Sequence, residues 1–417
     1  MTREEVQAIA LQKLVENNYN GVLVKKMGSG KSKTAIDAII KGNFKYVLIT
    51  SPRTNLKDSW YKEIRQWFYP DAPINSSHNF VFKNVTFNLV NIQTCYKWDI
   101  EFLKPYDLII YDEIHTCGEQ YFKLISNAKQ LKIPVIGLTG TPNLEDGFKK
   151  ETLYTTLPIL YTYQDSDKDG LINKRRYYIY QYNLSDEYKV IAGTKKKPFT
   201  IGELSQYEYL SQNIKKGQML MSRTGSTDWF SDAAHWGWGG NGTPDQKSAA
   251  LVYLNAIKYR KEFLWNLSSS ADIAVKFKHK ILDSRIANKV LLFSELTTQA
   301  NKLSAYAIHS KNADDVNKQL LESFDTGKIR ELSSVRSLSL GLNLVGANWA
   351  ILESYNSSPT DILQKLGRTN RLTVNDIANI IIIVPKGTQA EQWFNEFSKS
   401  LDLEDAVYIN DVNDLKI

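Results

Sequence analysis

Lys31 lies in the first group of residues whose types and spacing suit chemistry. The string GSGKS contains Gly28, Ser29, Gly30, Lys31 and Ser32. Glycines let a backbone fold closely around phosphate oxygens, a lysine adds positive charge, and a serine hydroxyl can hold a magnesium ion. An ordinary glycine turn before a helix is the alternative, because the strict pattern has a glycine where Lys25 stands. The string predicts a loop that binds the phosphates of a nucleotide.

Two adjacent acids, Asp112 and Glu113, form the second group. One acid of such a pair can hold a magnesium ion while its neighbour orients and deprotonates an attacking water. An acidic pair after a strand is often only a helix N-cap. Together with a separate phosphate loop, however, the pair predicts hydrolysis of a nucleotide. The segment Thr139–Thr141 follows another predicted strand, and its small hydroxyl side chains are suited to sensing a neighbouring phosphate.

The string QKLGRTNR contains the third group. Spacings of three and four residues place Gln364, Arg368 and Arg371 on one face of a helix, with Gly367 between them. Two arginines on a helix normally form a solvated face. An arginine that reaches a transferring phosphoryl group instead neutralises charge as it develops, which is worth about 10³ to 10⁵ in rate.

Other polar residues are candidates for contact with a nucleotide or with a polyanion. Gln7 lies on a predicted helix ahead of the phosphate loop, and its amide can both donate to and accept from an adenine edge. Arg53 and Thr54 follow one apolar strand, and Gln93 and Thr94 follow the next. Solvated polar loops are the alternative for all of them. Their position at strand ends makes them candidate phosphate contacts.

Short apolar runs predict the strands that position these groups. The runs are residues 22–24, 46–51, 85–91, 106–111, 135–138, 289–294, 305–309, 328–334, 349–354 and 377–384. Helical patterns lie between the runs, and open α/β sheets of this kind bind ligands at the carboxyl ends of their strands. The sequence therefore predicts an α/β protein with two doubly wound parallel sheets in tandem, of which only the first has a phosphate loop.

Residues 161–284 separate the two predicted sheets. This segment contains Lys195, Lys196 and Lys197, the tryptophan-rich string DWFSDAAHWGWGGNG and an amphipathic string, LVYLNAIKYRKEFLWNL. Basic residues interleaved with aromatic ones can grip a nucleic acid, although such aromatic residues more often pack under a loop. We expect a mostly helical intervening segment whose role the pattern leaves open.

Length and composition limit the class of protein. A chain of 417 residues with 42% apolar and 23% charged residues is too long for one core and has an ordinary globular composition. Its formal charge of +7 permits a polyanion partner without requiring one. Cys95 and Cys117 form no CxxC pair and suggest neither a disulfide framework nor a zinc site. With no signal peptide and no apolar run long enough to span a bilayer, we expect a cytoplasmic protein without membrane contact.

The motifs MGSGKS, DEIH, LTGTP and QKLGRTNR occur in the order of the superfamily-two helicases and translocases, which this chain resembles. The segment SPRTNL and its W..EI..W continuation look more like the Swi/Snf-type branch of double-stranded DNA translocases and its virus-encoded relatives. The resemblance implies a RecA-like domain at residues 1–160, an intervening segment at 161–284 and a second RecA-like domain at 285–417. From this resemblance we expect a compact DNA helicase that is encoded by a phage and acts in the host cytoplasm.

The resemblance also implies a role for each site residue. Lys31 would hold the β and γ phosphates of ATP, Ser32 and Asp112 would hold Mg²⁺, and Glu113 would be the general base. Gln364, Arg368 and Arg371 would act on the γ-phosphate, and His115 would couple the site to nucleic acid. The string SLSLGLN looks like the loop of this family between ATP and nucleic acid, in which the candidate contacts are Ser339, Gly341 and Asn343.

These inferences predict an ATP-dependent DNA helicase that couples hydrolysis to movement along duplex or branched DNA, chiefly through phosphate contacts. Replication or recombination intermediates are the expected substrates. Two alternatives remain open. The first is a translocase that moves on duplex DNA without separating the strands, and the second is a nucleic-acid clamp that binds ATP with little turnover. RNA remains a possible partner.

Overall fold

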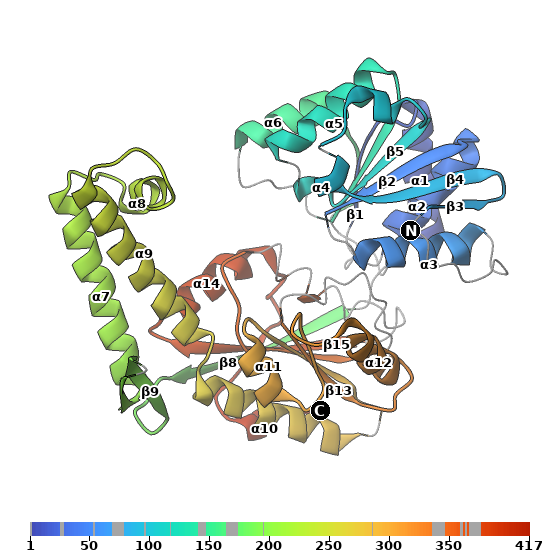
Figure 1. Cartoon of the computed structure of the whole chain (residues 1–417). Helices are drawn as coiled ribbons and strands as arrows, with labels where there is room; N and C mark the ends of the chain where they lie inside the picture. Colours follow the sequence, from blue (N-terminus) through green and yellow to red (C-terminus); the bar gives the residue numbers. More distant parts are fainter. Residues whose placement is uncertain are drawn as a thin grey trace. The chain divides into compact units, whose positions relative to one another are not determined.

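The structure is a computed structural model, and it describes the greater part of the chain. The described residues are 2–25, 29–52, 55–68, 79–95, 97–116, 118–140, 147–163, 174–194, 196–285, 287–335, 347–358, 362, 365–366 and 377–417. The chain forms two compact units, the first built from the elements up to strand β7 (Ile159–Tyr163) and the second from those that follow (Figure 1). Each unit has its own sheet and its own core.

The first unit contains a seven-stranded sheet in the order β3-β4-β2-β5-β6-β1-β7. Its strands are β1 (Gly21–Lys25), β2 (Tyr46–Ser51), β3 (Asn79–Phe82), β4 (Val85–Asn91), β5 (Leu108–Asp112), β6 (Val135–Thr139) and β7 (Ile159–Tyr163). The pairings are parallel except for that of β3 with β4, which is antiparallel. The predicted strands of the first half are thus confirmed, with β3 and β7 added at the two edges of the sheet.

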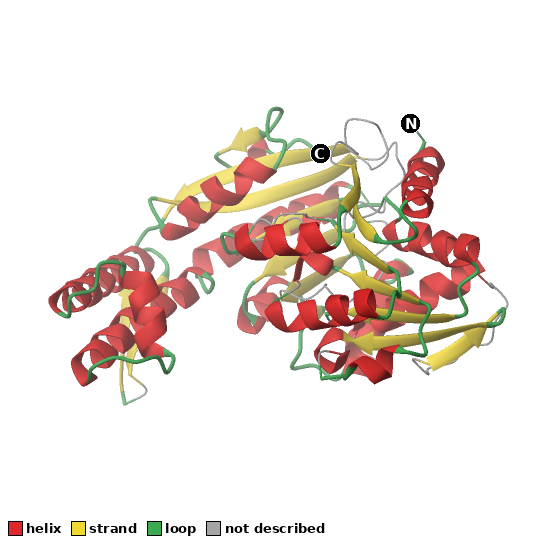
Figure 2. Ribbon diagram, turned by 90° about the horizontal axis from the view of Figure 1, so that it is seen from above, coloured by secondary structure: helices red, strands yellow, loops and turns green. Residues whose placement is uncertain are grey.

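Side chains that alternate along each strand give this sheet two cores. Leu23 points into one core, with α1 (Arg3–Glu16) and α2 (Lys31–Gly42). Val22 and Val24 point into the other, with α5 (Glu119–Gln130) and α6 (Gly147–Thr156). The helices of the unit are α1 (Arg3–Glu16), α2 (Lys31–Gly42), α3 (Asn55–Phe68), α4 (Ile92–Cys95), α5 (Glu119–Gln130) and α6 (Gly147–Thr156), with short 3₁₀ turns at Ile100–Leu103 and Ile114–Thr116. Helices therefore flank the strands, as a parallel sheet requires (Figure 2).

The second unit repeats this architecture with different strands. Its seven-stranded sheet has the order β12-β13-β11-β14-β15-β8-β16. The strands are β8 (Lys174–Asn183), β11 (Val290–Ser294), β12 (Ala307–Ile308), β13 (Glu331–Val335), β14 (Trp349–Leu352), β15 (Ile377–Lys386) and β16 (Val407–Ile409). The pairings β11–β13, β11–β14, β12–β13, β14–β15 and β8–β16 are parallel. Both predicted sheets are therefore present.

Helices of the second unit cover its sheet, and an arm extends from one end of it. The covering helices are α10 (Ser268–Ser284), α11 (Thr297–Leu303), α12 (Asp314–Asp325) and α14 (Gln389–Phe397), with 3₁₀ turns at Ser398–Ser400 and Val412–Asp414. The arm consists of the antiparallel hairpin β9 (Lys189–Thr194) and β10 (Lys197–Gly202) with α7 (Glu203–Arg223), α8 (Trp229–Gly237) and α9 (Pro244–Leu264). It is the green to yellow part of Figure 1.

The second unit includes elements that precede residue 285, where the motif-based division begins the second domain. Strand β8 pairs with β16, and Phe277 and Ile281 of α10 pack in the core of the second sheet. Both elements come from the segment that the sequence alone treats as intervening. Only the arm between them stands apart from this sheet, because its helices pack on one another around Met221 and Tyr253.

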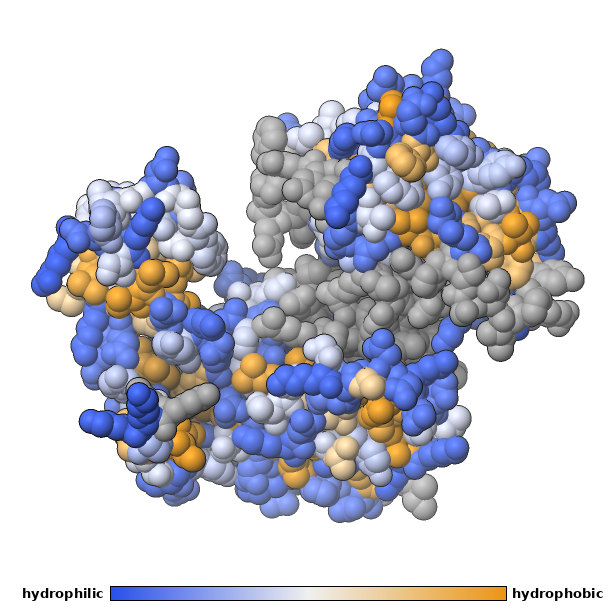
Figure 3. All heavy atoms as spheres, viewed as in Figure 1, coloured by the Kyte–Doolittle hydropathy of each residue, from blue (hydrophilic) through white to orange (hydrophobic). Residues whose placement is uncertain are grey.

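The tryptophans of the arm have different surroundings. Trp236 packs against the core of the arm, whereas Trp238 is 76% exposed and Phe230 is 57% exposed. Hydrophobic side chains gather on the face of the arm seen in Figure 3.

Among the residues that the structure describes, none of the helices combines the length and the apolar character needed to cross a membrane.

Candidate functional site

The phosphate-loop segment lies where the sequence predicts, between β1 and α2. Gly30 is the N-cap of α2 and has a φ of 83°, a left-handed conformation that favours glycine. Among the described residues no side chain caps this helix end, so the amides of its first turn, which begins with Lys31 and Ser32, can bind an anion. Ser29 is fully buried. Gly28 lies outside the described residues.

Gln7 lies directly against this loop. A Cβ atom added to Gly30 would come within 2.1 Å of the Gln7 Nε2 atom, so any larger residue at position 30 would displace the amide. Gln7 belongs to α1, which packs beside α2 through a shared core. The structure therefore brings the predicted glutamine next to the phosphate loop.

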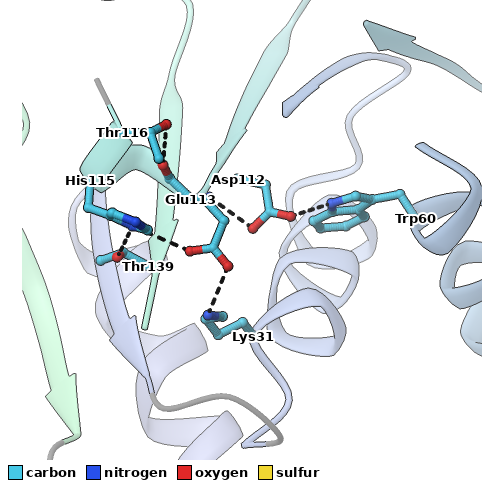
Figure 4. A network of polar contacts seen from close by, with 7 residues as sticks. All are labelled: Lys31, Trp60, Asp112, Glu113, His115, Thr116 and Thr139. Atoms are coloured by element: carbon cyan, nitrogen blue, oxygen red, sulfur yellow. Dashed lines mark hydrogen bonds and ion pairs between the residues drawn. The ribbon is translucent and has the colours of Figure 1, made fainter. Parts of the chain in front are cut away.

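A polar network joins the loop lysine to the acids at the end of β5 (Figure 4). Lys31 Nζ lies 3.7 Å from Glu113 Oε1, and His115 Nδ1 lies 3.4 Å from the other carboxylate oxygen of Glu113. The same His115 nitrogen is 2.9 Å from the Thr139 hydroxyl at the end of β6. The ends of β5 and β6 and the start of α2 thus meet at one carboxylate.

Asp112 is held on the other side of the network by the indole of Trp60. The Trp60 Nε1–H donates to Asp112 Oδ2 at 2.9 Å, and the Glu113 amide donates to Asp112 Oδ1 at 3.0 Å. Burial, and then the negative charge of Glu113, raise the pKa of Asp112. The positive charge of Lys31 and the hydrogen bond from Trp60 act in the opposite direction. Trp60 lies on α3, 52 residues earlier in the chain than its partner.

Glu113 has a left-handed backbone conformation, with a φ of 52°. Such a conformation is uncommon for a residue with a side chain and costs about 1 to 3 kcal/mol. It places the carboxylate of Glu113 beside Lys31 while Asp112, its neighbour in sequence, faces Trp60 (Figure 4). The left-handed conformation of Glu113 therefore directs the two neighbouring carboxylates into two different environments.

The residues of this site fit a nucleotide triphosphate. Within the described residues, Lys31 Nζ is buried and has no hydrogen-bond partner, so phosphate oxygens would satisfy it. The described part of the chain contains no group of three or more His, Cys, Asp or Glu side chains that could hold a metal ion. A magnesium ion here would therefore depend on Ser32, Asp112, the phosphates and water, as is usual for this ion.

The remaining predicted site residues divide into described and undescribed ones. Gln93 and Thr94 lie exposed on α4 at the end of β4, and Gln93 Nε2 donates to the Pro52 carbonyl oxygen at 3.1 Å, next to the end of β2. The candidates that lie outside the described residues are Arg53, Thr54, Thr141, Ser339, Gly341, Asn343, Gln364, Gly367, Arg368 and Arg371.

Sequence reasoning missed two residues of this region, Trp60 and Lys25. Trp60 is the first tryptophan of the W..EI..W string, and Lys25 stands where the strict phosphate-loop pattern has a glycine. Neither pattern alone says which polar group such a residue contacts, because the partners of Trp60 and Lys25 are set by the packing of α3 and α2 on the sheet.

Comparisons with known proteins identify two matching family models and a similar protein. Residues 1–144 match the family model of the type III restriction enzyme res subunit, and residues 271–373 match the helicase conserved C-terminal domain. The DNA 3'-5' translocase XPB2 of Sulfurisphaera tokodaii is 25% identical over 382 residues, which cover 88% of this chain and 78% of that protein.

Two solved structures share the fold. The Hef helicase domain of Pyrococcus furiosus has a TM-score of 0.56 and 15% sequence identity, over 93% of this chain and 96% of that one. Dbp5 of S. cerevisiae, in a structure bound to RNA and ADP BeF3, has a TM-score of 0.58 and 10% identity, over 98% of this chain and 90% of that one. At these identities the likeness concerns the fold, which is that of two RecA-like domains.

Proposed function

We propose that this chain, a nucleic-acid-stimulated ATPase of the superfamily-two helicase type, uses ATP hydrolysis to move along DNA. The two family matches and the similarity to XPB2 support an ATP-dependent helicase or translocase. DNA is proposed as the track because the curated relative is named as a DNA translocase and because the SPRTNL segment resembles double-stranded DNA translocases. The same resemblance supports a place near the Swi/Snf-like branch and a viral origin.

The network around Glu113 is the observation that carries this proposal. Lys31 would hold the β and γ phosphates, Glu113 would orient and deprotonate the attacking water, and Gln7 would contact the adenine. Mg²⁺ held by Ser32 and Asp112 would supply charge neutralisation at the phosphates. The contact from Glu113 through His115 to Thr139 connects the base to β6, and it is a candidate path from the hydrolytic site toward bound nucleic acid.

The helix that the string QKLGRTNR predicts is proposed to complete the site. Gln364, Arg368 and Arg371 carry the spacing of an arginine-finger helix in the sequence, and they lie outside the described residues. Their guanidinium groups would stabilise the charge that develops on the transferring phosphoryl group. ATP binding and hydrolysis would drive movement along the nucleic acid, with DNA phosphates bound by Arg53, Thr54, Gln93, Thr94, Ser339 and Asn343 and with Gly341 close to ATP.

Substitution of the proposed base tests the hydrolytic part of the proposal. Glu113→Gln should retain ATP binding and lose about 10²-fold or more in ATP turnover with and without DNA, because it removes the proton acceptor and keeps the shape of the side chain. Glu101→Gln is the matched control, since Glu101 is an exposed acid of the same unit, paired with Lys104. Turnover that is unchanged in Glu113→Gln would refute the assigned base.

XPB2 is named as a DNA translocase, and movement along DNA without strand separation is the second candidate function. A strand-displacement assay and a triplex-displacement assay, run with the same protein, distinguish the two activities. Release of the triplex strand alone would identify a duplex translocase, whereas release of a duplex strand would identify a helicase. A panel of single-stranded, duplex, forked and four-way DNA and single-stranded RNA identifies the stimulating track, and negligible turnover on all of them would favour an ATP-switched clamp.

A further inference from the structure

Lys25 is a completely buried lysine at the base of the phosphate loop. It is the last residue of β1, its exposed fraction is 0%, and it stands at the position where the strict phosphate-loop pattern has a glycine. Lysines are almost never fully buried unless they are paired. Within the described residues, however, no carboxylate forms an ion pair with the Lys25 amine.

A short chain of hydrogen bonds links this amine to the loop. Lys25 Nζ donates to Thr34 Oγ1 at 2.9 Å, and Thr34 Oγ1 donates to the Gly30 carbonyl oxygen at 3.0 Å. The same carbonyl accepts from the Thr34 amide, as the first intrahelical bond of α2. Thr34 therefore transmits the position of the Lys25 amine to Gly30, the residue that gives the loop its left-handed turn.

Within the described residues, the two charged groups that act on Lys25 both belong to α2. The pKa of Lys25 is lowered to about 7, chiefly by burial and also by the positive charge of Lys31, while the negative charge of Asp37 acts in the opposite direction. Lys31 is also the proposed phosphate ligand. An anion bound at the loop would therefore attract the Lys25 amine in its protonated form and weaken the repulsion between the two lysines.

We propose that Lys25 is a positioning residue for the phosphate loop, and that binding of nucleotide phosphates is completed by uptake of a proton at its buried amine. The inference rests on the proposed function, since it requires the loop to bind a nucleotide. It goes beyond that function because it assigns a second, internal cation to the loop and couples nucleotide affinity to pH.

Calorimetry of ADP binding to the full chain tests the proton. Titrations in two buffers of different ionisation enthalpy give the number of protons taken up per ADP. Lys25→Met keeps a long side chain and removes the amine, so the difference between wild type and Lys25→Met excludes the titration of ADP itself. That difference should be clearly larger at pH 7.5 than at pH 6, because an amine with a pKa lowered to about 7 is mostly neutral only at the higher pH.

Two further variants separate positioning from simple packing. Lys41→Met, at an exposed position near the end of α2, should show the proton uptake and the ADP affinity of the wild type. Thr34→Val keeps the shape of the side chain and removes the hydroxyl between the amine and Gly30, so ADP should bind it about tenfold more weakly. This variant also tests the proposal if Lys25→Met does not fold.

The outcomes distinguish the inference from the proposed function. ADP binding with the same proton uptake in wild type and Lys25→Met, or with unchanged affinity in Thr34→Val, would overturn the inference and leave the nucleotide site intact. No binding of ADP by the wild type would overturn the proposed function together with the inference.

Discussion

At the scale of single residues, the indole of Trp60 determines how Asp112 is presented. Its N–H donates to Asp112 Oδ2 at 2.9 Å, and a hydrogen bond to a buried carboxylate is worth about 1.5 to 3 kcal/mol. Trp60→Phe keeps the aromatic packing of α3 and leaves that oxygen without its donor. We expect the Mg²⁺ concentration for half-maximal ATP hydrolysis to rise about tenfold, because the carboxylate is no longer held in position.

The control for this prediction is Trp67→Phe, on the same helix. Trp67 is 48% exposed and lies under the Lys33 ammonium, so its substitution should leave the Mg²⁺ requirement as in the wild type. An equal Mg²⁺ requirement in Trp60→Phe and the wild type would show that Asp112 needs no support from α3.

Glu353, directly after β14, gives the second unit a pH-dependent stability. Burial raises the pKa of this carboxyl to about 7, and within the described residues its Oε2 atom has no hydrogen-bond partner. As pH rises from the ordinary carboxyl range toward 7, the unfolded chain loses this proton while the folded chain keeps it, so the free energy of unfolding falls. Above pH 7 both the folded and the unfolded chain have lost this proton, so the decrease in the free energy of unfolding has reached its full size.

Glu353→Gln should remove this decrease in the free energy of unfolding, because it replaces the buried carboxyl with an amide. The amide keeps the shape of the side chain, can still accept the hydrogen bond from Gln299 Nε2, and carries no charge at any pH. We expect the free energy of unfolding by urea to increase by up to about 3 kcal/mol at pH 8 and by much less at pH 5. Glu396→Gln, at an exposed position, serves as the control. An equal gain at both pH values would contradict the assignment.

At the scale of elements, Glu203 joins the arm to the second sheet. It is the first residue of α7, and its carboxylate accepts from the Ser268 amide at 2.6 Å and the Ser269 hydroxyl at 2.6 Å, at the start of α10. The N-cap residue of α10, Leu267, supplies no side-chain cap. The carboxylate of the first residue of α7 therefore caps the N-terminus of α10. Its negative charge also interacts favourably with the positive end of the α10 dipole.

Glu203→Ala should destabilise the second unit by about 2 to 3 kcal/mol, because it leaves buried donors without an acceptor. Glu203→Gln, which keeps one acceptor oxygen, should cost less. Thermal unfolding of both variants, beside Glu208→Ala at an exposed position of the same helix, measures the difference. If Glu203→Ala unfolds at the temperature of Glu208→Ala, the cap has no energetic role.

The same elements show how far the sequence reaches. Buried apolar runs predict the strands of both sheets because side chains alternate between two cores, as Val22, Leu23 and Val24 do. Motif spacing also predicts Lys31, Asp112 and Glu113, since strand ends of one sheet meet at one edge. Strand β8 was missed as a member of the second sheet because the arm separates it in sequence from the strands beside it. Contacts such as that of Trp60 depend on packing angles, which no local pattern encodes.

At the scale of the whole molecule, the two units share an architecture but not the described groups of the site. Both contain a seven-stranded sheet, whereas the phosphate loop and the acids belong to the first. A formal charge of +7 gives the whole chain a mild attraction to polyanions. A translocase has to bind every sequence it passes, so its contacts should be with the nucleic-acid backbone rather than with base edges.

Salt dependence tests that conclusion. Each phosphate contacted releases counterions, so the logarithm of the DNA affinity should fall linearly with the logarithm of the salt concentration, by about 0.7 per phosphate for single strands and about 0.9 for duplexes. Fluorescence anisotropy with oligonucleotides of unrelated sequence should give nearly the same slope and affinity for each. An oligonucleotide of the same bases with an uncharged backbone should bind weakly. If it binds as tightly as the natural strand, the bases rather than the phosphates hold the protein, and stepping along a uniform backbone loses its physical basis.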